Sequence, residues 1–212
     1  MEKSLCTLPD GGCLIETFAW APSAGVVRKA LHLERLNRSA DAFGISFDPV
    51  DVERHLKAIQ SNDPLRCRLT VSASGQIDLS TAALSIAAST WYVMVSDVRL
   101  NSSDSFLAHK TSQRALYDET RKTLPDGVDE VIFLNERSEV CEGTITNILV
   151  RTHKGDWFTP PISCGCLPGV YRQSLLDSGE ISEAVLTFSD LENAAEIRLC
   201  NSLRGEIKAK LL

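Results

Sequence analysis

Hydrophobic side chains recur at helical spacing in two segments near the start of the chain. Between residues 33 and 43 they fall on one helical face, and the pattern stops at Gly44, which predicts an amphipathic helix ended by a glycine. A second helix is expected to begin at Asp48-Pro49 and to place apolar residues on one face up to Ile59, because proline is favoured at the first helical position.

The pattern then changes to the alternation that is typical of β-strands. Residues 65–71 alternate between apolar and polar side chains, the chain turns at Ser74-Gly75, and the alternation resumes at residues 77–79. This order predicts a β-hairpin, and residues 91–95 predict one more strand. The first hundred residues are therefore expected to form helices on an antiparallel sheet.

Beyond residue 100 the pattern indicates short strands with little helix between them. Residues 115–120 have a helical pattern, and another helix is expected from Pro168-Gly169 to Gly179, with proline in its first turn and glycine past its last. The expected strands cover residues 131–134, 142–150, 156–159, 183–188, 197–200 and 206–210. We therefore predict an α+β fold, mostly antiparallel, with one lobe over residues 1–100 and another over residues 101–212.

Composition narrows the kind of partner. With 212 residues, of which 43% are hydrophobic, the chain can bury a core. The net charge of −6 argues against nucleic acid or an anionic membrane, which attract basic surfaces, and favours a small molecule. No apolar run approaches the roughly 20 residues of a membrane-spanning helix, and no signal-like stretch opens the chain, so a soluble cytoplasmic protein is expected.

Seven cysteines are scattered along the chain. An odd number without paired metal-ligand spacing indicates reduced thiols rather than a disulfide framework, and no metal site is expected. The one close pair, Cys164-x-Cys166, could be a redox or metal pair or two small residues beside a turn. The second interpretation is favoured, because no second pair and no histidine lie nearby in the sequence.

Four segments carry candidate chemistry on spacing alone. The helix start at residues 167–172 would point its amides at an anion such as phosphate, although most helix starts bind none. Arg35, on a helix edge, could grip a phosphate with two parallel hydrogen bonds or be a solvated charge. Glu142 lies in an apolar, strand-like stretch where a carboxylate must be paired, and Asn201-Ser202 places polar groups where a strand ends, suited to a ligand or to a plain turn.

A fifth segment contains Lys110, whose ammonium group could on its own be an exposed charge. The joint order of the segments changes this interpretation, because together they resemble the class IV aminotransferase family of pyridoxal 5′-phosphate (PLP) enzymes. This family includes branched-chain aminotransferases, D-amino acid aminotransferases and 4-amino-4-deoxychorismate lyase. The resemblance rests on Leu14-Ile15-Glu16-Thr17, His32 to Leu36, His109 to Arg114, Asn135 to Asn147, Thr159-Pro160-Pro161, Gly165 to Arg172 and Asn201 to Gly205.

The resemblance implies a two-lobed fold with a small N-terminal α/β lobe and a larger, barrel-like C-terminal lobe, assembled as a homodimer. It also implies a covalent link between the PLP aldehyde and Lys110, which later moves protons, and a contact between Glu142 and the pyridine nitrogen of the coenzyme. The residues that would hold the phosphate are Arg35, Val170 and Tyr171 through their amides, and Ser202.

Within the family the chain is most similar to the lyase. The block from Asn201 to Gly205 looks like the lyase ending, where branched-chain aminotransferases have a Gly-Thr-Ala-Ala turn. This implies PLP-dependent release of pyruvate to form 4-aminobenzoate, a folate precursor. An amino-acid transaminase and a shortened relative that binds PLP with little catalysis remain alternatives. The expected substrate-side residues are Thr17, Arg114, Leu203 and Arg204.

Two departures from the family pattern bear on the substrate. Little sequence precedes the Leu14 block, and Gln113 stands where the family commonly has asparagine. His109 receives no role, because neighbouring residues on a strand point to opposite faces.

Overall fold

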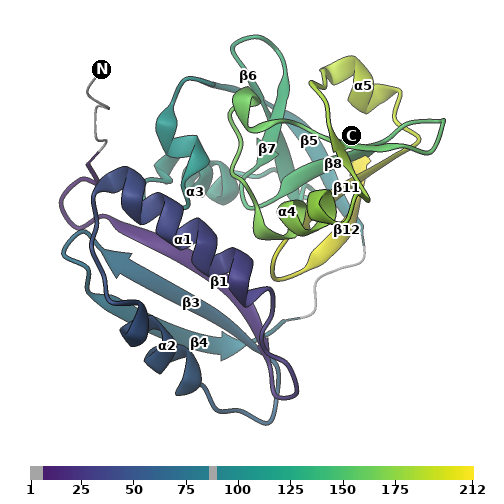
Figure 1. Ribbon diagram of the computed structural model, residues 1–212. Helices are drawn as coiled ribbons and strands as arrows, with labels where there is room; N and C mark the ends of the chain where they lie inside the picture. The colour runs from purple at the N-terminus through teal and green to yellow at the C-terminus, as the bar shows by residue number, and fades with distance from the viewer. Residues whose placement is uncertain (1–6, 86–89) are drawn as a thin grey trace. The chain divides into compact units, whose positions relative to one another are not determined.

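The computed structural model describes residues 7–85 and 90–212, which fall into two units (Figure 1). The first unit contains the described residues up to 85 together with His109–Gln113, and the second contains residues 90–108 and Arg114–Leu212. The sequence pattern suggests a boundary near residue 100, where β5 (Thr90–Leu100) ends. This strand lies wholly in the second unit, so the two units divide before it.

The first unit is an antiparallel sheet covered by two helices (Figure 1). The strand order is β2-β1-β3-β4. The elements are β1 (Cys13–Ala21), β2 (Gly25–Val26), α1 (Lys29–Phe43), α2 (Pro49–Lys57), β3 (Leu65–Ser72) and β4 (Ile77–Ala83). Both predicted helices and the predicted hairpin are confirmed: Gly44, with φ 64°, ends α1, and the Asp48 side chain caps α2 by accepting from the Val50 amide.

One face of this sheet forms the core beneath α1 and α2. Residues that are directly paired on neighbouring antiparallel strands point to the same face. On this face Leu14, Glu16 and Phe18 of β1 are paired with Val71, Leu69 and Cys67 of β3, and all six are buried. β1 was not predicted from the sequence, because residues 13–18 show no alternation of apolar and polar side chains; in the structure Leu14, Ile15 and Glu16 are buried in succession.

The second unit is built on an eight-stranded sheet that closes on itself. Its strand order is β10-β9-β8-β11-β12-β5-β6-β7, and a further pairing joins β7 to β8, so the strands from β8 to β7 form a closed ring. Besides β5, the elements are η1 (Ser105–Ala108), α3 (Ala115–Lys122), β6 (Glu130–Asn135), β7 (Val140–Gly143), β8 (Asn147–Arg151), β9 (Trp157–Thr159), η2 (Ile162–Cys164), α4 (Val170–Asp177), β10 (Ser182–Glu183), α5 (Phe188–Glu192), β11 (Glu196–Asn201) and β12 (Gly205–Leu211).

Apolar side chains fill this ring. Val93, Ile132, Ile148 and Leu199 belong to one core cluster, and each is 0% exposed. Parallel pairing occurs between β5 and β6, between β5 and β12, and between β9 and β10, while the other strand pairs are antiparallel. The mostly antiparallel, barrel-like lobe confirms the predicted α+β class.

One predicted strand in the second unit is wrong. Residues 183–188 were expected to form a strand, but only Glu183 does so, at the end of β10. Thr187 and Asp190 form a capping box that starts α5. This local signal at a helix start outweighs the β-strand preference of the apolar residues before it.

Two other predicted elements have different limits. The strand expected over residues 142–150 is interrupted at residues 144–146, where the chain bends between β7 and β8. Pro168 precedes the cap residue Gly169 and so lies outside the first turn of α4, although the helix itself is confirmed. In the part of the chain that the structure describes, no helix is long and apolar enough to cross a bilayer.

Candidate active site

Lys110 lies in an extended segment of the first unit that pairs with β1. The Ile15 amide donates to the Lys110 carbonyl oxygen at 2.8 Å, and Ser112 continues the pairing. Thr111 forms a bridge with Leu14 and therefore shares its face, toward α1. Because side chains alternate along an extended segment, Lys110 points to the opposite face. These hydrogen bonds fix the backbone from which the lysine side chain extends.

His109 points back toward α1. Its Nδ1 lies 3.0 Å from Ser39 Oγ, and its ring packs edge-on against Phe43 with 4.9 Å between ring centroids. Burial, followed by the charge of Arg38, lowers the pKa of His109. This histidine therefore packs against α1 on the side away from the Lys110 side chain.

Glu16 of β1 holds two side chains of α1 in a buried ion pair. Arg35 donates from Nε to Oε1 at 2.8 Å and from Nη2 to Oε2 at 2.7 Å, and His32 Nδ1 lies 2.6 Å from Oε2. Burial alone would raise the pKa of the Glu16 carboxyl, but the Arg35 charge and the hydrogen bonds from His32 and Arg35 outweigh it and lower the pKa to about 2. Arg35 is thus oriented by a carboxylate, and its contact with a phosphate stays a prediction. Thr17, the next residue on β1, points to the opposite face.

Glu142, on β7 of the second unit, is a buried carboxylate with a donor at each oxygen. Tyr117 Oη donates to Oε1 at 2.7 Å, and the Leu167 amide donates to Oε2 at 2.9 Å. The carboxylate is held away from water, since Glu142 is 6% exposed. Tyr117 was not among the residues predicted from the sequence. The available signal was its place in the first turn of a helix that follows directly after the Lys110 segment.

The start of α4 follows Leu167 and is suited to an anion. Gly169 occupies the cap position, and because glycine has no side chain, the cap cannot bond the first amides, which include those of Val170 and Tyr171. Asn147 Nδ2 donates to the Leu167 carbonyl oxygen at 2.9 Å, and Asn147 Oδ1 lies only 1.8 Å from where a Cβ on Gly169 would be. Only glycine fits at this turn.

Ser202, Leu203 and Arg204 lie in the turn between β11 and β12. Asn201 Oδ1 accepts hydrogen bonds from the amides of Leu203, at 3.1 Å, and Arg204, at 3.0 Å. The Arg204 guanidinium carbon lies 5.4 Å from the centroid of the Trp91 ring. The Asn201 side chain therefore sets the conformation of the turn that carries three of the predicted residues.

Arg114 contacts residues of its own unit. Its Nε lies 2.7 Å from Asp118 Oδ1, and its Nη2 donates to the Thr144 carbonyl oxygen at 3.2 Å. These contacts tie Arg114 to the turn after Glu142, and its predicted substrate contact stays a prediction.

The cysteines are free thiols in the described part of the chain. Cys164 and Cys166 are buried, and burial raises the pKa of Cys164 to about 12 and also raises the pKa of Cys166. Over residues 7–85 and 90–212 no group of three or more metal-ligating side chains occurs. The pair therefore has the character of small buried residues beside a turn.

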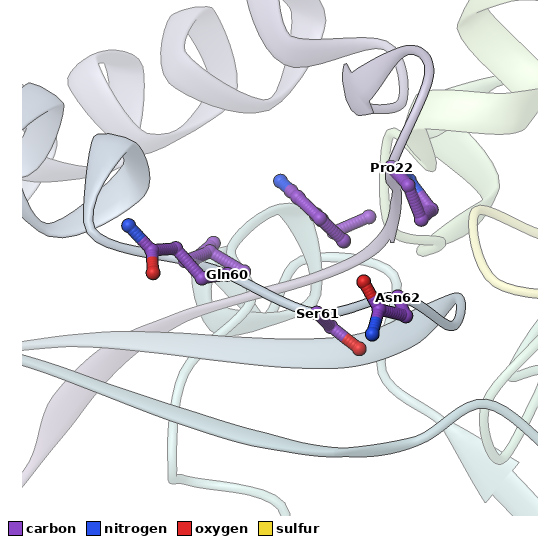
Figure 2. Close-up of a pocket in the computed structure, with 6 residues that line it drawn as sticks. Pro22, Gln60, Ser61 and Asn62 are labelled. Atoms are coloured by element: carbon purple, nitrogen blue, oxygen red, sulfur yellow. The ribbon is translucent and has the colours of Figure 1, made fainter.

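An open cavity in the first unit lies apart from the residues discussed above. Figure 2 shows it beside the loop that follows α2. Its volume is about 440 Å3, and it is lined by Trp20, Pro22, Ile59, Gln60, Ser61 and Asn62. Since none of the predicted site residues lines it, it gives no support to the predicted chemistry.

Comparisons with known proteins agree on the family and differ on the reaction. A Schizosaccharomyces pombe protein named "Putative aminodeoxychorismate lyase" is 27% identical over 191 residues, which cover 85% of this chain and 82% of that protein. The crystal structure of a "Putative amino-acid aminotransferase" from Mesorhizobium loti has a TM-score of 0.88 and 38% identity, and the match covers 95% of this chain and 100% of the other.

A third comparison supports the fold alone. The crystal structure of 4-amino-4-deoxychorismate lyase from Pseudomonas aeruginosa has a TM-score of 0.81 at 20% identity, covering 94% of this chain and 83% of the other. The model of the class IV amino-transferase family matches residues 13–212. The chain therefore belongs to the class IV aminotransferase family, whose members are PLP enzymes.

Proposed function

We propose that the chain binds PLP on Lys110 and acts as a 4-amino-4-deoxychorismate lyase, which releases pyruvate and forms 4-aminobenzoate. The observation that carries the proposal is the buried Glu142 carboxylate, held by Tyr117 and the Leu167 amide. A carboxylate fixed in this way suits a protonated pyridine nitrogen. When bound, the coenzyme supplies an electron sink for the charge left by proton removal.

The chain's own residues have separate tasks in this proposal. The Lys110 amine, once displaced by the substrate amine, removes the proton from the amine-bearing ring carbon. The amides of Val170 and Tyr171 bind the phosphate at the start of α4, where Gly169 allows a close approach. Arg35 and Ser202 also bind the phosphate. The protein is proposed to act as a homodimer of this chain.

Two comparisons support different reactions. The lyase is favoured by the similarity to the Schizosaccharomyces pombe protein over 85% of the chain and by the lyase-like block from Asn201 to Gly205. A PLP-dependent amino-acid transaminase is the second candidate, because the Mesorhizobium loti structure is 38% identical.

A two-substrate assay separates the candidates. Purified protein incubated with PLP and 4-amino-4-deoxychorismate is expected to release pyruvate and 4-aminobenzoate in equal amounts. Exchange of amino groups between amino acids and 2-oxoglutarate or pyruvate, without pyruvate release from the first substrate, would identify a transaminase. A yellow protein that is inactive in both assays would be a binding relative with little catalysis.

Gly169→Ala is expected to weaken PLP binding about fivefold or more, because the new Cβ overlaps Asn147 Oδ1, 1.8 Å away, and overpacking costs about 1–3 kcal/mol. The dissociation constant is measured by absorbance titration. Gly179→Asn is the control: it lies past the other end of α4 with φ 72° and open space around it, and asparagine tolerates that conformation. Unchanged PLP affinity in Gly169→Ala would contradict the close-packing argument.

Arg204→Ala is expected to raise the KM for 4-amino-4-deoxychorismate about tenfold or more, because a carboxylate loses a charge-assisted partner. Initial rates over a range of substrate concentrations measure this. Arg99→Ala, an exposed side chain at the end of β5, is the control. An unchanged KM in Arg204→Ala would remove this residue from the substrate site.

A further inference from the structure

We infer that Tyr117 is a positioning residue for Glu142, and that α3 serves to place the Tyr117 hydroxyl beside the Glu142 carboxylate. The inference rests on the proposed contact of Glu142 with the coenzyme and extends that proposal to a side chain with no predicted role. The evidence is the contacts that Arg114, Tyr117 and Arg121 make with the end of β7 and the turn after it, together with the chemistry of the Tyr117 phenol.

Arg114 is the N-cap residue of α3, and Tyr117 and Arg121 lie four residues apart on one face of the helix. All three bind the end of β7 or the turn after it. Arg114 Nη2 donates to the Thr144 carbonyl oxygen at 3.2 Å, Tyr117 Oη donates to Glu142 Oε1 at 2.7 Å, and Arg121 Nη1 donates to Thr144 Oγ1 at 2.9 Å. The phenol is therefore held between two guanidinium groups that dock on the same segment.

The turn after β7 is also held by Glu130, which is 0% exposed. Its Oε1 accepts from the Thr144 amide at 3.0 Å and from Thr144 Oγ1 at 2.6 Å, and its Oε2 lies 3.4 Å from Arg121 Nη1. The turn cannot shift without breaking these buried bonds. The turn next to Glu142 is therefore fixed in position by Glu130 as well as by Arg114 and Arg121.

The Tyr117 side chain is built as a permanent donor. Its ring packs edge-on against Phe133, with 5.5 Å between centroids and an interplanar angle of 89°. Burial, followed by the charge of Glu142, raises the pKa of Tyr117, so the phenol keeps its proton at any working pH. With the Leu167 amide at the second oxygen, two donors fix the plane of the carboxylate and stabilise its ionised form.

Loss of the phenol oxygen leaves Glu142 Oε1 without this donor inside a buried site. The carboxylate is then free to rotate about its last bond, and its anionic form loses stabilisation. If Glu142 binds the pyridine nitrogen as proposed, the weaker stabilisation of its anion would favour the nitrogen's proton on the carboxylate, and a less protonated ring would accept less charge. The chain's grip on the coenzyme phosphate is not involved.

Tyr117→Phe is the test, with Tyr92→Phe as its matched control, because Tyr92 lies on β5 and is 43% exposed. We expect borohydride to link PLP to Lys110 in Tyr117→Phe as in the wild type. We also expect the midpoint of the pH titration that follows the absorbance of the bound coenzyme to shift. We also expect a fall in kcat of about tenfold to a hundredfold, the range for a hydrogen bond to a charged group, with KM nearly unchanged. Tyr92→Phe should match the wild type in each measurement.

A double-mutant cycle with Glu142→Gln identifies the route of the effect. If Tyr117 acts through Glu142, Tyr117→Phe adds little once Glu142→Gln is present, in the absorbance titration as in kcat. A wild-type titration curve for Tyr117→Phe, or effects of the two variants that simply add, overturns the inference while the proposed function stands. A wild-type protein that fixes no PLP overturns both. The absorbance arm gives its answer whichever substrate proves to be the right one.

Discussion

Lys110→Arg is expected to abolish the fixation of PLP by borohydride and to lower turnover at least about a thousandfold. Arginine keeps the charge and nearly the length of lysine, but its guanidinium stays protonated and cannot act as a nucleophile or as a base. A side chain that moves protons contributes about a hundredfold to ten-thousandfold on its own, and Lys110 would also lose the covalent link.

Reduction with borohydride followed by peptide mapping measures the link directly, and the two-substrate assay measures turnover. Lys57→Arg, at the exposed end of α2, is the control and should retain both properties. PLP fixed on another lysine, or a Lys110→Arg variant that works at a rate near that of the wild type, would remove Lys110 from its proposed role.

Glu16→Ala is expected to destabilise the protein by about 3–5 kcal/mol, the cost of leaving a buried charge without its partner. The variant would leave Arg35 and His32 facing a site from which a carboxylate has been removed, with side chains that are 5% and 2% exposed. Urea unfolding at pH 7 measures the difference in the free energy of unfolding.

Glu34→Ala provides a matched control on α1. Glu34 pairs with Arg38 at 3.1 Å, but the two side chains are 61% and 50% exposed, and exposed pairs one helical turn apart contribute about 0.5 kcal/mol or less. Equal losses for the two variants would show that the buried pair has no special weight.

The same carboxylate predicts how stability depends on pH. The pKa of Glu16 is lowered from 4.5 to about 2 in the folded protein. A group with a depressed folded pKa binds its proton more readily when unfolded, so its contribution is fully present above pH 4.5 and is lost as the pH falls toward 2. The difference in unfolding free energy between the wild type and Glu16→Ala should therefore shrink between pH 5 and pH 2.5. A constant difference over that range would contradict the pairing.

The elements that the sequence reveals are those with local signals. The helix that ends at Gly44 and the helix capped by Asp48 both carry their stop and start residues within one turn. Long-range pairing has no such signal. The Cys13 amide donates to Ser112 Oγ across 99 positions of sequence, and the parallel pairing of β12 with β5 in the ring places Ala209 opposite Trp91. The alternating pattern likewise predicts a strand at residues 91–95. It does not show that this strand, β5, belongs to the second unit, because its partners β6 and β12 come later in the sequence.

The candidate site divides in the same way. The demand that Glu142 be paired follows from its apolar neighbours, since a buried carboxylate without donors is costly. The identity of the donor, Tyr117, depends on which face of α3 meets β7, and this is a matter of tertiary packing. Arg35 illustrates a further limit: the sequence pattern places it on a helix edge, as a phosphate-binding residue or a solvated charge, and carries no signal that Glu16 accepts from its Nε and Nη2.

The division of the chain also decides how it can be cut. The segment His109–Gln113 belongs to the first unit, although the residues on both sides of it belong to the second. A fragment that stops at residue 100 would contain β1 without the Lys110 carbonyl oxygen that accepts from the Ile15 amide. The remaining fragment would contain His109–Gln113 without β1, the strand with which this segment pairs. Neither unit can be obtained intact by a single scission, because the first unit takes up His109–Gln113 from the middle of the sequence of the second.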